Sequence, residues 1–340
     1  MTASTSREYA AYLDAYPLDP DWRAAKEESG MNNTTRMIYA GQDKLVLRIY
    51  ENHRDRALIE TEHAILWELQ QAKLAFEVPV PVRNRQHESI TIGPDGKLAA
   101  LYRYIPGNRP DPSADEHVYG LGAAAGELSQ ALARMADLPE LIPQYKPYYE
   151  LEENHGALPN EALLQLCVER PAQFGDRHDN IVYLLRERER LTALRDRFAG
   201  LPQQWIHGDI VFTNAVARED RIAGLLDFEF CTIDARAMEL AVVLAEFPGE
   251  AREEALRRFE LFCNGFGERA KLSGEELQQL PALIKLRMID VWLHFAGRLQ
   301  SGLDPDHVLQ DQIDRVSFVC KWVDEHEAEL AAIFRRYITE

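Results

Sequence analysis

Three oxygen-bearing side chains, Asp209, Asn214 and Asp227, have the types and spacing that phosphoryl transfer requires. Asn214 follows Asp209 by five positions, and Asp227 ends an apolar stretch shortly afterwards. In that chemistry an Asp accepts the proton of the attacking hydroxyl, an Asn five positions later binds a metal ion, and a second Asp binds the same metal. Mg²⁺ prefers hard oxygen ligands, and the base must stay off the metal. Each residue alone could be a helix cap or a turn residue, but independent coincidences do not explain the joint spacing.

The segment that carries these residues is predicted to be a loop followed by a β-hairpin. Its sequence is IHGDIVFTNAVAREDRIAGLLDFEF, residues 206–230. AVAR and IAGLLDF have the composition of short strands, and Glu219-Asp220 between them is a turn signal. The hairpin would therefore present Asp209 and Asn214 before its first strand, and Asp227 at the end of its second strand.

The longer segment IHGDIVFTNAVAREDRIAGLLDFEFCTIDARAMELAVVL resembles the aminoglycoside phosphotransferase and choline kinase superfamily, and within it the type II homoserine kinase branch. The resemblance implies a protein-kinase-like fold and the phosphorylation of small-molecule hydroxyls with ATP. It also implies that Asp209 is the catalytic base and that His207 braces the catalytic loop. Asn214 and Asp227 would be the Mg²⁺ ligands. Relatives usually have Asp-Leu-Ala where this chain has Glu-Leu-Ala from Glu239, and that acid is expected to start a helix and tie back to the catalytic loop.

The N-terminal part must then supply a nucleotide clamp, and the strand LVLRIY is the candidate. Its alternating side chains place Val46 and Arg48 on one face. In the kinases that the chain resembles, a small apolar residue covers the adenine and a Lys two positions later contacts the phosphates. Here that Lys is Arg48, which can hold phosphate through two hydrogen bonds but is bulkier. The expected helix partner of Arg48 is Glu62, which stands seven residues before Leu69 as in the family's pattern. The alternative for Arg48 is an exposed strand residue, and the alternative for Glu62 is a residue on the surface of a helix.

The remaining nucleotide contacts have weaker sequence signals. The sequence has no Gly-rich loop of the kinase type. Only the stretch of residues 30–35 precedes the first strand at the right place. Its backbone N–H groups and its Asn and Thr side chains, with Asn32 and Thr34 as the candidates, could hold phosphate oxygens. The adenine is expected at the hinge, against the backbone of Arg103, Tyr104 and Ile105. That assignment depends on position in the implied fold, because recognition through the backbone leaves little side-chain pattern.

An acceptor site is expected on the predicted helix 275–300. Arg287, Asp290 and His294 follow one another at i, i+3 and i+7, so they lie on one stripe of that helix. An Arg beside an Asp and a His could hold the carboxylate and the ammonium of an amino-acid-like substrate. The alternative is a solvated or salt-bridged helix face. Asp234 could help to shape the same pocket, or it could cap the helix that follows it.

The apolar pattern, together with the resemblance, predicts an α+β, two-lobed, protein-kinase-like fold. The N-terminal lobe covers 1–105 and contains a helical extension over 1–28, a small antiparallel sheet and one helix. The second lobe covers 106–340 and is expected to be mainly helical, with the β-hairpin embedded in it. Its predicted helices cover 115–137, 160–171, 177–199, 251–271, 275–300 and 306–336.

Composition limits the classes of partner and compartment. Lys and Arg number 38 against 56 Asp and Glu, so the net charge is −18. Such a chain is poorly suited to nucleic acid or an anionic membrane, because neutralising phosphates requires clustered cations. The four cysteines, at 167, 231, 263 and 320, form no CxxC pair, so neither a zinc site nor a disulfide framework is indicated. With no secretory signal and no apolar run long enough to cross a bilayer, a cytoplasmic protein is expected.

The sequence therefore predicts an ATP- and Mg²⁺-dependent kinase of a small-molecule hydroxyl, without nucleic-acid or membrane partners. By resemblance, a homoserine-like amino alcohol is the expected acceptor. One alternative is an aminoglycoside or sugar kinase of the same superfamily, which a wide pocket lined with carboxylates would favour. Another is a non-catalytic nucleotide-binding scaffold, which the departure at Arg48 and the missing Gly-rich loop would favour. The sequence gives no indication of the oligomeric state.

Overall fold

The computed structural model describes residues 4–26, 33–51, 55–135, 138, 141–156 and 158–340. The chain forms two compact units. Unit 1 comprises Met1–Arg109, Leu138–Gln144 and Asn214–Glu229, and unit 2 comprises Pro110–Asp137, Tyr145–Thr213 and Phe230–Glu340. The candidate residues are divided between the units, because Asn214 and Asp227 belong to unit 1 whereas Asp209 belongs to unit 2.

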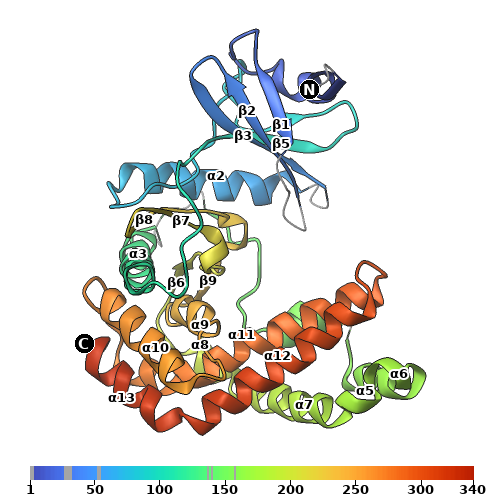
Figure 1. The fold of residues 1–340 in the computed structure, drawn as a ribbon, viewed down its shortest axis with the longest axis vertical. Helices are drawn as coiled ribbons and strands as arrows, with labels where there is room; N and C mark the ends of the chain where they lie inside the picture. The colour runs from blue at the N-terminus through green and yellow to red at the C-terminus, as the bar shows by residue number, and fades with distance from the viewer. Residues whose placement is uncertain (1–3, 27–32, 52–54, 136–137, 139–140, 157) are drawn as a thin grey trace. The chain divides into compact units, whose positions relative to one another are not determined.

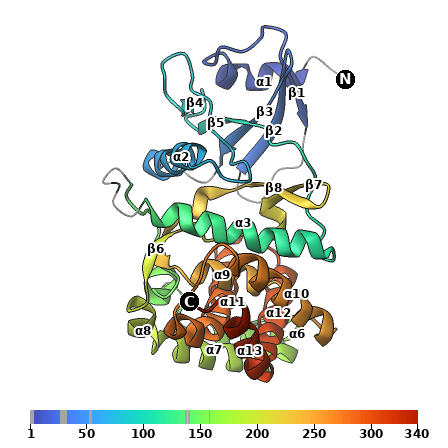
Figure 2. The ribbon, with the colours of Figure 1, turned by 90° about the vertical axis from the view of Figure 1, so that its left-hand side faces the viewer.

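Unit 1 is built on a five-stranded antiparallel sheet with the strand order β1-β2-β3-β5-β4 (Figure 1 and Figure 2). Its strands are β1 (Arg23–Lys26), β2 (Asn33–Ala40), β3 (Asp43–Tyr50), β4 (Thr91–Ile92) and β5 (Leu98–Arg103). The two predicted hairpins are confirmed, since β2 pairs with β3 and β4 pairs with β5. The order of the strands puts β3, which carries Arg48, in the middle of the sheet.

Different helices cover the two faces of this sheet. On one face, the apolar side chains of β3 pack with Tyr12 and Leu13 of α1 (Ser4–Leu13) in a buried cluster. On the other face, Glu62 of α2 (Arg56–Gln71) contacts polar side chains of β3. Successive residues of a strand point to opposite faces, which explains why one strand contributes both to an apolar core and to a polar site.

The expected helical extension over residues 1–28 is wrong for residues 14–26. The helix α1 ends at that residue, and Arg23–Lys26 forms the strand β1 instead, which pairs with β2. Pro17 and Pro20 explain the change, because proline lacks a backbone N–H and disfavours the helical conformation in the residue before it. The N-terminal segment therefore adds an edge strand and an apolar helix to the sheet.

A β-hairpin from the middle of the chain also belongs to unit 1. Its strands are β7 (Ala215–Arg218) and β8 (Arg221–Leu225), as the sequence predicts. Isolated β-bridges join this hairpin to Asn108 and to Glu77. The hairpin therefore groups with the N-terminal segment, although the predicted boundary after residue 105 assigns it to the second lobe.

Unit 2 is mainly helical, as expected. Its helices are α3 (Asp115–Ala133), α4 (Leu151–His155), α5 (Asn160–Glu169), α6 (Pro171–Phe174), α7 (His178–Thr192), α8 (Arg195–Ala199), α9 (Met238–Leu244), α10 (Arg252–Gly267), α11 (Gly274–Gln300), α12 (Asp306–Glu325) and α13 (Glu327–Tyr337). The unit also contains an antiparallel pair of strands, β6 (Gln203–Ile206) and β9 (Thr232–Ala235). This pair is missing from the prediction because strands of four residues are too short to show a period.

The helices α3 and α10 pack closely together, and Figure 2 shows α3 along its length. A Cβ atom at Gly122 of α3 would lie 2.1 Å from the carbonyl oxygen of Phe262. A Cβ atom at Gly265 of α10 would lie 2.1 Å from the carbonyl oxygen of Tyr119. Only glycine permits this approach of the two backbones. The helix α3 also contacts β6, so the packed pair supports the strand that leads into the loop of Asp209.

Three predicted helices are each divided in the structure: 160–171, 177–199 and 306–336. The first divides at Arg170, which precedes Pro171 and leaves the helical conformation for that reason. The last divides at His326, whose imidazole hydrogen-bonds to the carbonyl of Trp322 at 2.8 Å. Nothing in the structure explains the division of the second helix.

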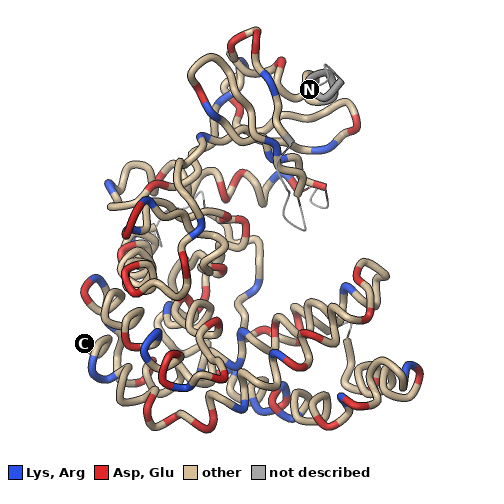
Figure 3. Tube along the Cα trace, viewed as in Figure 1, with Lys and Arg blue, Asp and Glu red and all other residues tan. Residues whose placement is uncertain are grey.

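The fold class is α+β, as the sequence predicts, with a small antiparallel sheet in unit 1 and a mainly helical unit 2. No helix in the described ranges combines the length and the apolar character that crossing a bilayer requires. None of the four cysteines forms a disulfide. Figure 3 shows Asp and Glu interspersed with Lys and Arg along the helices, so the charges of each unit are mixed in sign.

Candidate active site

Unit 1 gathers carboxylates around the guanidinium of Arg48. Nη2 of Arg48 lies 3.0 Å from Oδ1 of Asp227. Nη1 lies 3.5 Å from Oε1 of Glu62 and 3.9 Å from Oε2 of Glu229. The structure thus brings together Arg48, its predicted helix partner and one predicted metal ligand. Glu229 joins them, and sequence reasoning assigns it no role although it stands two residues after Asp227.

Burial controls the charges of this cluster. The side chain of Glu62 is 3% exposed, and burial raises its pKa to about 7 although Arg48 acts in the opposite direction. Burial would lower the pKa of Arg48, but Asp227 and Glu62 raise it well above its ordinary value. The guanidinium therefore remains a fixed positive charge, the property that a phosphate contact needs.

A buried chain of hydrogen bonds supports Glu62. The hydroxyl of Tyr50 lies 3.4 Å from Oε2 of Glu62 and 2.7 Å from the hydroxyl of Tyr102, which lies 2.9 Å from Nε2 of His63. Burial lowers the pKa of His63 to about 3, so its imidazole is neutral. The chain joins two strands to α2 and fixes the helix that carries Glu62. Strand alternation places Tyr50 on the face of Arg48, which is the sequence signal that could have found it.

Asn33 also faces the carboxylate cluster. Its Nδ2 donates a hydrogen bond of 3.0 Å to Oε2 of Glu229. Sequence reasoning selects its neighbours instead, and the sheet register supplies the missing information. Asn33 pairs with Tyr50, and directly paired residues in an antiparallel sheet point to the same face. Asn33 therefore lies on the face of the sheet that carries Arg48.

Of Asn32 and Thr34, the two neighbours of Asn33 that the sequence selects, the structure describes only Thr34. Thr34 pairs with Ile49, so it lies on the opposite face, and its hydroxyl donates to Oε1 of Glu51 at 2.7 Å. The structure does not bring Thr34 into the cluster of Arg48. Asn32 lies outside the described residues. Among the described residues of this segment, Asn33 and Thr35 lie on the face of the sheet that carries Arg48, because they pair with Tyr50 and with Arg48 itself.

The hairpin brings the two predicted metal ligands close to each other within unit 1. The backbone N–H of Leu226 donates to the carbonyl of Asn214 at 2.8 Å, so Asn214 is bonded to the residue before Asp227. Asp227 has a φ of 65°, an uncommon conformation for a residue other than glycine and one that recurs at functional sites. Among the described residues, no group of three His, Cys, Asp or Glu side chains could hold a metal alone. This donor set fits Mg²⁺, which proteins commonly hold with one or two side chains plus substrate phosphates.

The predicted hinge also lies in unit 1. The backbone N–H groups of Arg103 and Tyr104 donate to carbonyl oxygens of the same unit at 3.0 and 3.3 Å. Of the three predicted hinge residues, Ile105 is then the one whose backbone N–H donates no backbone hydrogen bond among those of the described structure. Its buried side chain lies against the β7–β8 hairpin, where a Cβ atom at Gly224 would be 2.8 Å away. Val46 is half-buried on the face of β3 that also carries the guanidinium of the cluster.

In unit 2, the loop that carries Asp209 is held from two sides. The carboxylate of Glu239 accepts the backbone N–H groups of His207 and Gly208 at 2.7 and 3.1 Å. Nδ1 of the fully buried His207 accepts the backbone N–H of Asp209 at 3.2 Å. Gly208 has a φ of 78°, and a Cβ atom there would lie 3.1 Å from the carbonyl oxygen of Phe230, which explains the glycine. The position of Asp209 is therefore closely defined.

Arg287 of α11 contacts the same loop. Its Nη2 lies 2.6 Å from Oδ1 of Asp209, and its Nη1 donates to the hydroxyl of Tyr148 at 2.8 Å. That hydroxyl in turn donates to the carbonyl of Gly208 at 2.7 Å. Burial would lower the pKa of Arg287, but Tyr148, Asp209 and Asp290 raise it above its ordinary value, so the guanidinium stays charged. Helix periodicity cannot reveal a contact with a residue 78 positions away.

The predicted stripe on α11 is only partly a cluster. Oδ2 of Asp290 lies 3.8 Å from Nη1 of Arg287, and its Oδ1 lies 2.7 Å from Nε2 of His155. His294 is exposed and packs edge-on against Phe295. In the part of the chain that the structure describes, His294 makes no hydrogen bond to Arg287 or Asp290. The structure therefore brings two of the three residues together and adds His155 of α4.

Asp234 lies behind this cluster, fully buried in β9. Its carboxylate accepts the backbone N–H groups of Tyr148 and Ala235, both at 2.6 Å. Burial raises the pKa of Asp234 to about 7, and the two hydrogen bonds act in the opposite direction. Its observed contacts are those of a residue that positions Tyr148, which itself contacts Arg287.

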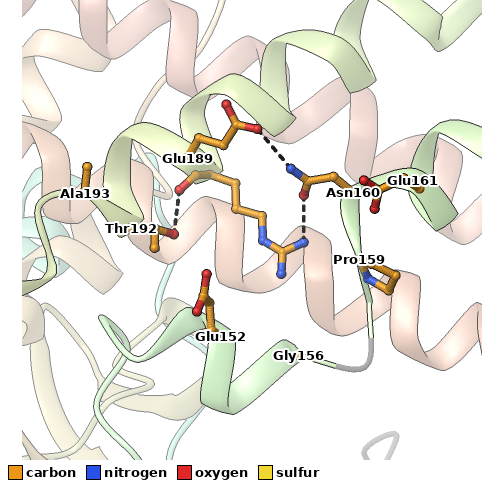
Figure 4. Close-up of a pocket in the computed structure, with 9 residues that line it drawn as sticks. Glu152, Gly156, Pro159, Asn160, Glu161, Glu189, Thr192 and Ala193 are labelled. Atoms are coloured by element: carbon orange, nitrogen blue, oxygen red, sulfur yellow. Dashed lines mark hydrogen bonds between the residues drawn. The ribbon is translucent and has the colours of Figure 1, made fainter.

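A cavity of about 720 Å³ lies elsewhere in unit 2, where α4, α5 and α7 meet (Figure 4). Asn160 donates to Glu189 at 3.1 Å and accepts from Arg188 at 3.1 Å, so polar side chains of the wall are bonded to one another. The lining residues are Glu152, Gly156, Pro159, Asn160, Glu161, Arg188, Glu189, Thr192 and Ala193. This set contains none of the predicted site residues.

Comparison by sequence with known proteins finds phosphotransferases. A family model described as the phosphotransferase enzyme family matches residues 7–272. A homoserine kinase of Bradyrhizobium sp. (strain ORS 278) is 25% identical over 311 residues, which are 88% of this chain and 89% of that protein. A homoserine kinase of Methylobacillus glycogenes is 22% identical over 347 residues, which are 95% of this chain and 99% of that protein.

Solved structures of small-molecule kinases share the fold. An amicoumacin kinase in complex with AMP-PNP, Ca²⁺ and Ami has a TM-score of 0.69 at 16% identity, and the match covers 92% of this chain and 91% of that chain. A microcompartment-associated aminopropanol kinase has a TM-score of 0.63 at 16% identity, over 96% of this chain and 98% of that chain. At these identities the likeness concerns the fold alone.

Proposed function

The chain belongs to the phosphotransferase enzyme family and is a small-molecule phosphotransferase, and from this we propose that it transfers the γ-phosphate of ATP to the hydroxyl of a homoserine-like amino alcohol. The observation that carries the proposal is the contact between Asp209 and Arg287. A base and an anion-binding group side by side suit a hydroxyl acceptor that also carries a carboxylate.

Unit 1 offers the groups that the nucleotide needs. Arg48 would contact the phosphates, and Glu62 would hold Arg48 in position. The backbone N–H of Ile105 would face the adenine. Asn214 and Asp227 would hold Mg²⁺, with phosphate oxygens and water as the other ligands. When bound, Mg²⁺ offsets the negative charge of the phosphates.

Asp209 would act as the general base. Its carboxylate accepts the hydroxyl proton while the hydroxyl oxygen forms a bond to the γ-phosphorus. The bond between that phosphorus and the β–γ bridging oxygen breaks, and ADP leaves with its electron pair. The products are the phosphate ester, ADP and one proton that Asp209 releases to water. Because His207 and Glu239 hold the loop, Asp209 keeps one position, on which the alignment of proton and acceptor depends.

Two observations support an amino-acid-like acceptor. The two relatives compared by sequence, which match 88% and 95% of this chain, are homoserine kinases. Arg287 and Asp290 offer opposite charges close together, which suits the carboxylate and the ammonium of such a molecule. An aminoglycoside carries several ammonium groups and no carboxylate, so a buried guanidinium beside the base disfavours it.

ADP formation in a screen of hydroxyl acceptors tests this function. The panel contains amino alcohols, sugars and aminoglycosides, each with and without Mg²⁺. We expect turnover that requires Mg²⁺ and is highest with homoserine or a close analogue. Turnover confined to aminoglycosides or sugars would contradict the proposed acceptor, and turnover that is independent of divalent metal would contradict the metal role. A protein that uses no acceptor in the panel would refute the proposal.

A further inference from the structure

The guanidinium of Arg287 is bound to the catalytic loop at two points. It contacts the carboxylate of Asp209 directly at 2.6 Å, and it reaches the carbonyl of Gly208 through the hydroxyl of Tyr148. The side chains of Arg287 and Asp209 are each 18% exposed. Arg287 therefore engages one of the two oxygens with which Asp209 would receive a proton.

A mostly buried guanidinium needs an anionic partner, because an unpaired charge in that position is costly. Asp290 is a poor replacement for Asp209, since it lies 3.8 Å from Arg287 and its other oxygen is bonded to His155 at 2.7 Å. An anion brought by the acceptor could take the place of Asp209 at the guanidinium. Arg287 and Asp209 are in direct contact, so the anion and the reacting hydroxyl of such an acceptor must be only a few carbons apart.

We propose that Arg287 is the specificity-determining residue of the acceptor site and a positioning residue for the base. It holds Asp209 until an acceptor carboxylate binds the guanidinium, and the released carboxylate then accepts the proton of the hydroxyl on the same molecule. This inference rests on the proposed function, since it requires phosphoryl transfer through Asp209. It adds that the carboxylate of the acceptor is a condition for efficient transfer as well as a binding group.

The test compares homoserine with 3-aminopropan-1-ol, the same amino alcohol without the carboxylate, at saturating ATP and Mg²⁺. The wild type should prefer homoserine in kcat/KM by about 10- to 100-fold, the contribution of one charged hydrogen-bonded pair. Arg287→Gln should lose this preference, because the KM for homoserine should rise much more than the KM for 3-aminopropan-1-ol, which brings no carboxylate to the guanidinium. Arg287→Lys keeps the charge but loses the two-pronged geometry, so it should be intermediate.

Arg298→Gln is the matched control, because Arg298 lies on the same helix and pairs with Asp304 at 2.6 Å. It should leave the preference for homoserine unchanged. A second readout uses the wild type alone: 2-aminobutyrate, which has the carboxylate but no hydroxyl, should stimulate ATP hydrolysis several-fold by releasing Asp209 toward water, whereas propylamine should not.

Three results would overturn the inference: an Arg287→Gln variant that keeps the preference for homoserine, an equal loss with both amino alcohols, or a wild type whose ATP hydrolysis does not respond to 2-aminobutyrate. In each case phosphoryl transfer by the wild type would still support the proposed function. The absence of transfer to every acceptor would instead refute the function itself. The 2-aminobutyrate measurement remains decisive even if Arg287→Gln fails to fold, because it needs no variant.

Discussion

At the scale of single residues, the arginine at position 48 is explained by its surroundings. Two nitrogens of its guanidinium face different carboxylates, those of Asp227 at 3.0 Å and Glu62 at 3.5 Å. A lysine ammonium is a compact point charge and cannot divide its contacts in this planar arrangement. The substitution of the usual Lys therefore preserves the positive charge of the cluster and changes how it is shared.

This arrangement predicts the effect of replacing Arg48. Arg48→Ala should raise the KM for ATP by about 10- to 100-fold, because it removes a charged contact to phosphate and leaves Glu62 without its cation. Arg48→Lys should have a smaller effect. The control is Arg36→Gln on the neighbouring strand, whose Nε donates to the hydroxyl of Tyr9 at 2.6 Å on the other face of the sheet. An unchanged KM in Arg48→Ala would remove Arg48 from the nucleotide site.

At the scale of elements, α9 holds the loop of Asp209 through the buried carboxylate of Glu239 in its first turn. Burial raises the pKa of Glu239 from 4.5 to about 7, while the N–H groups of His207 and Gly208 act in the opposite direction. The folded protein therefore holds this proton more tightly than the unfolded chain does. The corresponding contribution to stability is complete below about pH 4.5 and is lost as the pH rises through about 7.

Glu239→Gln should remove this pH dependence. Between about pH 5.5 and 8.5, the stability of the wild type relative to the variant should fall with rising pH, by up to ~2 kcal/mol. Urea unfolding of both proteins across that range measures the difference. Glu276→Gln is the control, because the pKa of Glu276 is lowered and its difference from the wild type should stay constant in this range. A constant difference for Glu239→Gln would contradict the account of α9.

The helix α1 is a second element with a measurable effect. Leu13 is 1% exposed in the apolar cluster beneath β3, whereas Leu303 is 64% exposed. Leu13→Ala should lower the free energy of unfolding by about 2–5 kcal/mol because it leaves a cavity. Leu303→Ala should change it by less than ~0.5 kcal/mol. Equal effects in urea titrations would show that α1 does not stabilise unit 1.

At the scale of the whole molecule, the sequence predicts single helices and hairpins better than the pairing of segments that are distant in the chain. The β2–β3 and β7–β8 hairpins follow from alternating residues between turn signals, and the long helices follow from their apolar period. The β6–β9 pair and α4 are too short to show a period. The segment 23–26 becomes a strand only because β2 is available to pair with it, which no local pattern reveals.

The same distinction holds for the candidate site. Spacing alone selects Asp209, Asn214 and Asp227, because their distances along the chain are characteristic of the chemistry. The contact of Asp209 with Arg287 joins residues 78 positions apart, and that of Asn33 with Glu229 joins residues 196 positions apart. Such contacts arise from the tertiary packing of elements, and a single sequence carries no signal for them.

The most direct test of the account is the role of Asp209 in product formation. Phosphorus NMR of the wild type with ATP, Mg²⁺ and homoserine should show a new phosphate ester that grows as ADP appears. Asp209→Asn should lower kcat by about 100-fold or more, because proton acceptance is lost, while calorimetry shows an affinity for ATP within about 3-fold of the wild type. A variant that forms the ester at nearly the wild-type rate would contradict the assignment of Asp209 as the base.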